Sequence, residues 1–392
     1  MKEGKAPYPL RYSLFLGLYY SASAAYQGFA GPFYQEACGM DGTRLLCLLV
    51  ATPAISMLMQ PLWGAAGDRM NTRNSALYMM GSLALISMLL MGVSRSFGAL
   101  MVCTCLFATF FMPLQPMVDS IILEDLSLRR QPFGPIRLLG SVSFAAASLA
   151  QGALFNGRYH LMPYTVAALL ALLLLATPVL PVVQGHQHGG HHVPISALFQ
   201  LPQMKAVLLM LTPLMLALGY FYSYYTLYVT SLPGGSSQLV GLASFISAMS
   251  ELPFIFYSDK LFRRYGTGRL MIMAAFLLTV RFAVLAVARN AYVALATQLL
   301  HAGSFIAITL SASYYINRVV PDELKASGQM LLSMIGFGLA RVFGVFVGGF
   351  IANTAGGMAG GFAFMAAVCF VTLVLGARHF LRIPPVNGET AA

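Results

Sequence analysis

Long apolar runs, separated by short polar segments, make up most of this chain of 392 residues. A helix of about 20 apolar residues crosses the roughly 30 Å hydrocarbon core of a bilayer, so each run predicts a membrane-spanning helix. The runs are continuous, whereas strands of a membrane β-barrel alternate apolar with polar residues, which excludes a barrel. The predicted fold is an all-α integral membrane protein with twelve transmembrane helices, at residues 12–33, 45–66, 75–94, 98–122, 137–156, 161–182, 205–229, 238–258, 269–288, 291–316, 328–352 and 359–381.

The longest polar break falls near the middle of the chain. We interpret residues 183–204 as a cytoplasmic linker between two pseudo-symmetric six-helix halves, residues 1–182 and 205–392. Four histidines in this linker could bind a metal, but its glycine-rich composition favours a solvated segment. We therefore expect neither a metal site nor a cofactor. The histidines are His186, His188, His191 and His192.

One polar pattern repeats between the halves. The second and the eighth apolar runs both end in an aspartate followed by a basic residue. Such a pair can hold a neighbouring helix end in a contact that forms in one conformation and breaks in another. Duplicated halves around a central site are the architecture of alternating access, so we expect these loops to gate it. The residues predicted for gating are Gly64, Asp68, Arg69, Arg73, Asp259 and Lys260.

Composition and charge agree with a membrane protein. The chain is 58% hydrophobic and 9% charged, against about 45–50% and about 25% in soluble proteins. Its net charge of +11 does not indicate nucleic-acid binding, because the basic residues lie in small groups at the ends of apolar runs. With both termini in the cytoplasm, sixteen Lys and Arg lie inside and four outside, as the positive-inside rule requires. This predicts a bacterial inner membrane protein with cytoplasmic termini.

The sequence offers no catalytic centre. The apolar runs contain neither a His-x-x-His or Glu-x-x-His pair nor a Ser/Lys pair beside an acid. The chain lacks a Gly-x-x-x-x-Gly-Lys-Ser/Thr motif, which would bind the phosphates of ATP. Its five cysteines show no pairing pattern. We expect neither a membrane-embedded enzyme nor an ATP-driven pump.

Several motifs resemble one superfamily of membrane transporters. Residues 64–73, Gly-Ala-Ala-Gly-Asp-Arg-Met-Asn-Thr-Arg, are similar to the loop signature of the major facilitator superfamily, with Asn71 where the signature has glycine. Further motifs resemble the group that contains lactose permease and the phenylpropionate permeases, and they are spread over essentially the whole chain. They are Gln60-Pro-Leu-Trp-Gly, Phe133-Gly-Pro-Ile-Arg-Leu-Leu-Gly, Ser250-Glu-Leu-Pro, Val280-Arg and Leu300-His-Ala-Gly-Ser-Phe. The resemblance implies the major facilitator fold and proton symport.

For substrate binding, the resemblance points to three residues. Asp119 and Arg137 fall where lactose permease has its substrate-binding carboxylate and arginine, and Phe144 falls where a tryptophan stacks on the sugar. Asp119 also follows two prolines that should bend its helix and give the acid room to meet a ligand. The alternative is a salt bridge between Asp119 and Arg137 that only joins two helices.

For proton coupling, the resemblance points to Glu251, Arg281 and His301. Glu251 is also one of only two acids deep within the apolar runs, where burial makes protonation near neutral pH possible. The alternatives are a permanent Glu251–Arg281 pair and a histidine that only hydrogen-bonds. Gln298 and Ser304 replace a lysine and the proton-carrying glutamate of lactose permease, so a galactoside substrate is not implied.

Arg341 has no evident acid partner in the sequence. The apolar runs hold three arginines against two acids, and a charge near the bilayer centre costs about 2.5–3.5 kcal/mol on insertion scales. An arginine in a central cavity is suited to a carboxylate or phosphate. The alternative is an arginine that binds backbone carbonyls and locks helices together.

Tyrosines complete the predicted pocket. Tyr220, Tyr224 and Tyr228 recur every four residues and share one helix face. We expect Tyr228 to belong to an aromatic belt at the membrane boundary, and we leave Tyr26, Tyr220 and Tyr224 between ligand contact and such a belt.

The predicted function is secondary active transport of a small organic solute with protons, by alternating access and as a monomer in the lipid bilayer. The surplus arginine favours an amphipathic organic anion such as an aromatic carboxylate. The alternative is a proton-coupled sugar or nucleoside symporter. An exporter of drugs or metabolites and a non-transporting membrane sensor are less favoured, since a sensor has no need of intramembrane charges.

Overall fold

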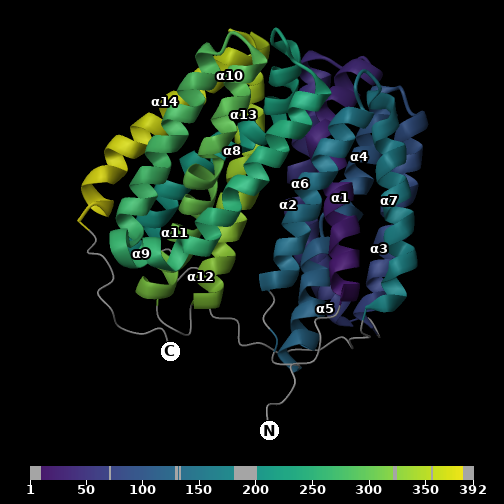
Figure 1. Ribbon diagram of the computed structural model, residues 1–392, viewed down its shortest axis with the longest axis horizontal. Helices are drawn as coiled ribbons and strands as arrows, with labels where there is room; N and C mark the ends of the chain where they lie inside the picture. Colours follow the sequence, from purple (N-terminus) through teal and green to yellow (C-terminus); the bar gives the residue numbers. More distant parts are fainter. Residues whose placement is uncertain are drawn as a thin grey trace. The chain divides into compact units, whose positions relative to one another are not determined.

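The computed structural model describes residues 10–69, 72–128, 131, 134–180, 201–320, 325–354 and 356–382. Within these residues the protein is all-helical (Figure 1). Contacts within the chain divide it into two compact units: residues 1–39 with 55–189, and residues 40–54 with 190–392. Helix α2 (Gly42–Arg69) contributes to both units. The predicted halves, 1–182 and 205–392, stay a prediction. Most of the predicted linker, including its four histidines, lies outside the described residues.

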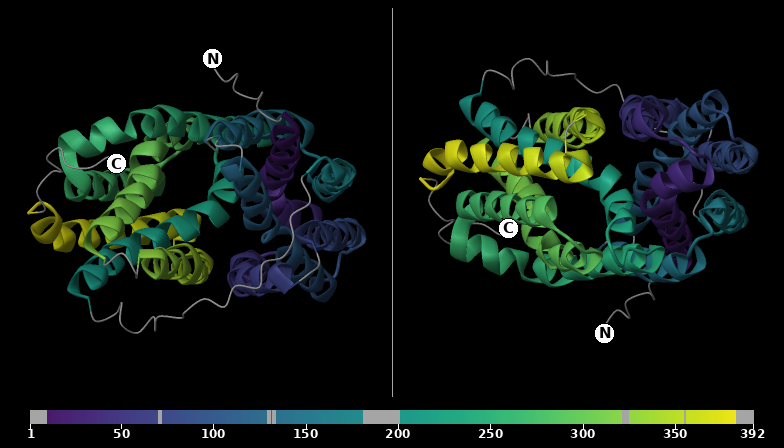
Figure 2. Two further views of the ribbon diagram at one scale, coloured as in Figure 1. Left: turned by 90° about the horizontal axis from the view of Figure 1, so that it is seen from below. Right: turned by 90° about the horizontal axis from the view of Figure 1, so that it is seen from above.

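In the first unit, α1 packs against α6 and α7, and α3 packs against α4 and α7 (Figures 1 and 2). Buried aromatic rings such as Phe15, Phe29 and Phe107 fill the space between them. The helices are α1 (Leu10–Pro32), α3 (Arg73–Val93), α4 (Phe97–Phe111), α5 (Leu114–Leu128), α6 (Gly134–Leu154) and α7 (Met162–Ala176), with the short turns η1 (Phe33–Ala37), η2 (Tyr159–Leu161) and η3 (Thr177–Val179).

Regular helix is interrupted before Asp119, while the predicted bend itself stays a prediction. Helix α4 ends at Phe111 and α5 begins at Leu114, so Pro113 falls at the break. Proline lacks a backbone N–H and its ring clashes with the preceding turn, which interrupts the helix. Asp119 therefore lies on a separate helical segment from the residues before the break.

In the second unit, α14 packs against α8 and α9, and α13 packs against α8 and α14. The helices are α8 (Pro202–Ser231), α9 (Ser237–Val287), α10 (Ala291–Ala296), α11 (Ala307–Val319), α12 (Lys325–Leu332), α13 (Ala340–Thr354) and α14 (Gly357–Phe380). A 3₁₀ turn, η5 (Thr297–Leu300), and two π-helical turns, η6 (Ala302–Ile306) and η8 (Ser333–Leu339), lie between them.

Helix α9 has 51 residues and is broken at Gly266, where φ is 76° and ψ is 160°. A straight helix of this length would be about 77 Å long, far more than one crossing needs. Side chains other than glycine rarely adopt this backbone conformation. Gly266 therefore separates the two predicted spans 238–258 and 269–288, and it brings Glu251 and Arg281 onto different segments of one continuous element.

Each of the twelve predicted runs overlaps a helix. Among the described residues, eight helices are long and apolar enough to cross a membrane, or nine if a pair bent by 41° between Ala291–Leu300 and Ala302–Arg318 counts as one span. Helices α1 and α6 are long enough but are not among them, because serine, glutamine, tyrosine and arginine lower their hydropathy. An all-helical multi-pass fold is shown, while the number twelve stays a prediction.

Candidate functional site

Glu251, Arg281 and His301 come together in the second unit. Glu251 lies on α9 two residues before Pro253, which removes one backbone hydrogen bond from the preceding turn. Arg281 lies beyond the Gly266 bend of the same helix. His301 stands between the 3₁₀ turn η5 and the π-helical turn η6. Irregular helix therefore surrounds the histidine, as is frequent at functional sites.

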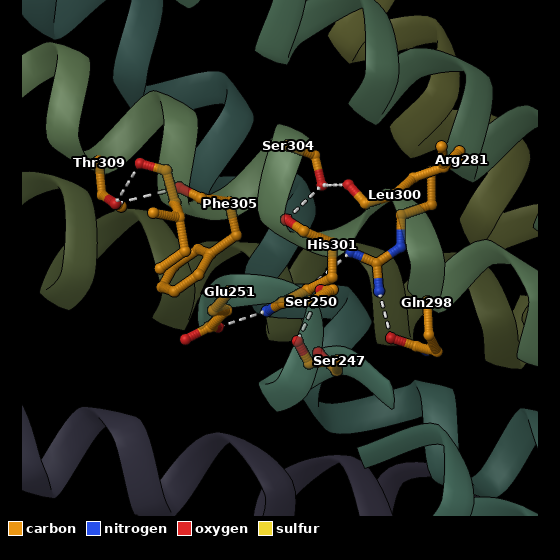
Figure 3. Close-up of polar contacts among 11 residues, drawn as sticks. Ser247, Ser250, Glu251, Arg281, Gln298, Leu300, His301, Ser304, Phe305 and Thr309 are labelled. Atoms are coloured by element: carbon orange, nitrogen blue, oxygen red, sulfur yellow. Dashed lines mark hydrogen bonds and ion pairs between the residues drawn. The ribbon is translucent and has the colours of Figure 1, made fainter. Parts of the chain in front are cut away.

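These side chains form one chain of hydrogen bonds (Figure 3). His301 Nε2 lies 3.1 Å from Glu251 Oε1, and Arg281 Nη1 lies 3.0 Å from His301 Nδ1. Arg281 Nη2 donates to Gln298 Oε1 at 2.7 Å. Arg281 has no direct ion pair with Glu251 among the described residues, so the histidine joins the two.

The arginine determines which tautomer the histidine adopts. A guanidinium has donors only, so Nδ1 of His301 must accept its hydrogen bond and therefore carries no proton. Nε2 then carries the proton and donates it to the carboxylate of Glu251. Adding a second proton to His301 would break its bond to Arg281, whereas Glu251 can accept a proton while this contact is kept. In this geometry the carboxyl group is the better proton acceptor.

The three side chains of this hydrogen-bonded series differ in how much of each is exposed. Arg281 is fully buried and His301 is 3% exposed, while the side chain of Glu251 is 22% exposed. The guanidinium of Arg281 also lies 4.1 Å from the centroid of the Phe221 ring, a favourable cation–π contact. Arg281 is thus the buried end of this series of hydrogen bonds, and Glu251 is its partly exposed end.

A cavity of about 460 Å³ lies along α9 near this cluster, although Glu251 itself does not line it. Its lining begins at Ser250 and Ala302, the sequence neighbours of Glu251 and His301, and runs along α9 to exposed Lys260 and Arg264. The space is large enough for several water molecules, each of which occupies about 30 Å³. The remaining lining residues are Pro253, Phe254, Tyr257, Leu261 and Tyr265.

Arg341 lies on α13, directly after the π-helical turn η8. Its guanidinium lies 4.6 Å from the centroid of the Tyr222 ring. Tyr222 in turn meets His301 and Phe305 edge-on, with ring centroids 6.3 Å and 5.9 Å apart. No hydrogen bond or ion pair joins Arg341 to any residue that the structure describes. Its surroundings therefore supply an aromatic face and no counter-charge.

In the first unit, Asp119 and Arg137 both lie near a tyrosine pair on α1. The guanidinium of Arg137 is 4.7 Å from the Tyr20 centroid, and Gln115 donates a hydrogen bond of 2.7 Å to the Tyr20 hydroxyl. The hydroxyl of Tyr19 lies within electrostatic range of both charges. Oδ1 of Asp119 is buried and has no hydrogen-bond partner among the described residues. The alternative to substrate contact, a salt bridge of Asp119 with Arg137, is not among the ion pairs within the described residues.

The predicted aromatic residues differ in how they are placed. Phe144 lies two turns after Arg137 on α6 and is half-buried. Tyr26 is buried against Phe107, and its hydroxyl lies 3.3 Å from that of Tyr34. These positions leave the predicted ligand roles of Phe144 and Tyr26 untested.

Tyr220 and Tyr224 are stacked on each other in the core of the second unit, with centroids 4.8 Å apart. The hydroxyl of Tyr220 donates to the Met358 carbonyl at 2.8 Å, so it is engaged in packing α8 against α14. The hydroxyl of Tyr224 is buried without a hydrogen-bond partner in the described chain. Tyr228 donates to the Leu285 carbonyl at 2.8 Å.

Only part of the predicted gating set is described. Asp259 accepts a hydrogen bond of 3.1 Å from the Tyr314 hydroxyl, and Lys260 is exposed. Gly64 lies on α2 with open space where a side chain would be. The side chains of Asp68, Arg69 and Arg73 lie outside the described part of the structure. A gating role stays a prediction for all of these residues.

Sequence reasoning gave no site role to two members of the second-unit cluster, Gln298 and Tyr222. Gln298 precedes His301 by three residues, which places both on one helix face, and this polar spacing was the available signal. Tyr222 had no such signal, because it lies between the tyrosines that share a face. Among the described residues, no group of three or more His, Cys, Asp or Glu is placed to hold a metal ion.

Comparison with known proteins agrees with this architecture. The model of the MFS_1 like family matches residues 9–364. The maltose permease of Geobacillus stearothermophilus is 27% identical over 354 residues, which cover 89% of each chain. A protein of Escherichia coli (strain K12) described as "Probable 3-phenylpropionic acid transporter" is 26% identical over 248 residues, 62% of this chain and 65% of that one.

Solved structures give the same fold. The nucleoside transporter NupG superposes with a TM-score of 0.83 at 17% identity, covering 96% of this chain and 99% of that one. At this identity the match concerns the fold alone. Together with the family match over nearly the whole chain, it shows that this protein belongs to the MFS_1 like family of major facilitator superfamily transporters and is a membrane permease rather than an enzyme.

Proposed function

We propose that this permease takes up a small organic solute together with protons, by alternating access. The observation that carries this proposal is the hydrogen-bonded chain Glu251–His301–Arg281–Gln298 in the second unit. Within a membrane, a titratable carboxyl group held by hydrogen bonds beside a buried arginine is costly to maintain, so it is a functional feature by default.

In this proposal Glu251 carries the proton. Its side chain is the partly exposed end of this series of hydrogen bonds, and its sequence neighbour Ser250 lines the cavity that runs along α9. His301 orients the carboxylate through Nε2, and Arg281 keeps His301 neutral by donating to Nδ1. In this proposal the carboxylate takes up its proton when a conformational change separates it from His301, which donates to it here. The proton is thereby coupled to the state of the carrier.

The proposed substrate is an amphipathic organic anion, such as an aromatic carboxylate. Arg341 supports this class because it lies on an aromatic face without a counter-charge among the described residues. The similarity to the "Probable 3-phenylpropionic acid transporter" also favours it, over the 62% of the chain that this similarity covers.

A sugar or nucleoside is the second candidate. The similarity to a maltose permease covers 89% of the chain. The buried Oδ1 of Asp119 and the Tyr20–Gln115 pair supply hydrogen-bonding groups of the kind that hydroxyl-rich solutes need.

The experiment begins with thermal unfolding of purified protein against 3-phenylpropionate, benzoate, maltose and uridine. A compound at about 100 times its dissociation constant stabilises the protein by roughly 2.7 kcal/mol, which shifts the midpoint measurably. The compound that shifts it is then used in proteoliposomes. Glu251→Gln should abolish accumulation driven by a proton gradient yet retain exchange of labelled for unlabelled substrate. The glutamine amide is uncharged, like a protonated carboxyl group, but it cannot release a proton.

The matched control is Glu36→Gln, which removes the charge of an exposed acid in the turn η1. This variant should accumulate substrate as the unmodified protein does. Uphill accumulation by Glu251→Gln at the unmodified rate would show that Glu251 does not carry the proton.

A further inference from the structure

The second unit holds an imbalance of charge around His301. Arg281 donates hydrogen bonds to His301 and Gln298 and lies on the Phe221 ring, and through His301 it is linked to the acid of this cluster, Glu251. Arg341 has only the Tyr222 ring among the described residues. The guanidinium of Arg341 is only partly exposed and has no hydrogen-bonding partner among the described residues, and a carboxylate can bind two of its N–H groups at once.

The packing of α8 against α13 holds Arg341 in this position. Gly219 contacts the backbone of Arg341 so closely that a Cβ at Gly219 would clash with its Cα and carbonyl oxygen. Tyr222 lies one turn further along α8, on the face that Gly219 presents to α13. The same contact thus sets the guanidinium over the tyrosine ring.

The aromatic face continues beyond Tyr222. Phe305 meets Tyr222 edge-on and is stacked with His301, with centroids 5.3 Å apart. An apolar or aromatic body next to a carboxylate would find its contacts on these rings. The anionic end would then meet Arg341 close to the residues that hold Glu251.

From this cluster we infer that Arg341 binds the carboxylate of a monoanionic substrate, and that one such anion moves with one proton in an electroneutral cycle. The inference rests on the proposed function and adds the charge class and the stoichiometry. One unpaired arginine accepts one negative charge, and one carboxyl group accepts one proton. The loaded and the empty cluster therefore carry the same net charge, so a complete cycle moves no net charge across the membrane.

The first test compares carboxylates with their uncharged amides as ligands of the purified protein. 3-Phenylpropionate or benzoate should raise the unfolding midpoint, and 3-phenylpropionamide and benzamide should not. In Arg341→Gln the affinity for the carboxylate should fall about 10–150-fold, the usual range for hydrogen bonds to a charged group. Arg341→Lys keeps the charge without the two-pronged geometry and should lose less.

Arg289→Gln is the matched control, because Arg289 is exposed in the turn between α9 and α10 and its loss removes the same charge from the same unit. It should bind carboxylates as the unmodified protein does. Equal affinity of Arg341→Gln and the unmodified protein would overturn the inference, as would stabilisation by the amides, maltose or uridine without any by the carboxylates.

The second test needs no variant. In proteoliposomes, accumulation of 3-phenylpropionate should follow the pH gradient and should change less than about twofold when the membrane potential is set from 0 to about −100 mV. Movement of one net charge would instead change accumulation by about 50-fold over that range. A 50-fold change would contradict the electroneutral cycle.

The two proposals fail differently. If maltose or uridine is the cargo and Glu251→Gln still loses its uphill uptake, proton coupling stands and the anion site falls. If Glu251→Gln accumulates carboxylate normally while Arg341→Gln binds it weakly, the anion site stands and the assignment of Glu251 and the proton stoichiometry fall.

Discussion

Single residues in this permease are stabilised by contacts that also decide their protonation. Arg281 is fully buried and donates to both His301 and Gln298. These bonds offset the loss of water around the guanidinium, and they leave His301 only one nitrogen that can carry a proton. The histidine therefore orients Glu251 and does not accept the transported proton in this conformation.

This assignment predicts different outcomes for two substitutions of His301. His301→Gln offers an amide N–H in place of Nε2–H, so it should keep proton-driven uptake within about tenfold of the unmodified rate. His301→Ala removes the hydrogen-bond partner of Glu251 and one of the two of Arg281, and it should lower stability by about 2–5 kcal/mol, with loss of uptake. Initial uptake rates and unfolding midpoints measure both. Complete loss of uptake in a stable His301→Gln would instead indicate a proton relay through the imidazole.

At the level of helices, close contacts at glycine determine how near two helices can approach each other. Helix α8 meets α13 at Gly219, where a side chain would strike the backbone of Arg341. Backbone atoms cannot turn aside as the end of a flexible side chain can, so the two helices would have to separate. The position of Arg341 over Tyr222 therefore depends on the absence of one methyl group.

Gly219→Ala should destabilise the protein by about 1–3 kcal/mol through overpacking and should lower the unfolding midpoint by several degrees. Gly98→Ala is the control, since a Cβ there meets no atom within 4 Å and alanine is the better helix former. A midpoint for Gly219→Ala equal to that of Gly98→Ala would show that the α8–α13 contact yields without cost.

At the scale of the whole molecule, the distribution of basic residues predicts the orientation in the membrane. Sixteen Lys and Arg lie on the predicted inside and four on the outside, at Arg44, Arg95, Arg158 and Arg289. A bias of this size sets the topology of a multi-pass protein during insertion. We propose a bacterial inner membrane location with both termini in the cytoplasm.

Reporter fusions test this orientation. Alkaline phosphatase fused after Ala392 should be inactive, because it stays in the reducing cytoplasm, and the same enzyme inserted at Arg158 should be active. A fluorescent protein that folds in the cytoplasm should give the opposite pattern. An active phosphatase at the C-terminus would reverse the predicted orientation.

The helical membrane fold could be predicted from the sequence alone. Apolar runs of about 20 residues dictate helices in lipid, because every backbone N–H and C=O must be paired within the segment. Pro113 likewise marked the break between α4 and α5, since proline cannot donate a hydrogen bond. Their polar character within apolar runs placed Glu251, Arg281 and His301 among the candidates, and the resemblance implied their role in proton coupling. These are local properties, and each follows from the residues themselves.

Tertiary structure alone decided how those residues are joined. The sequence pattern left open a direct pair of Glu251 with Arg281, but His301 stands between them because the bend at Gly266 and the irregular turns around His301 set the approach of the helices. It also left Tyr220 between ligand contact and an aromatic belt, and the structure adds that its hydroxyl donates to the Met358 carbonyl where α8 packs against α14. Which face of a helix meets a neighbour depends on where the other helices lie, and no local pattern carries that information.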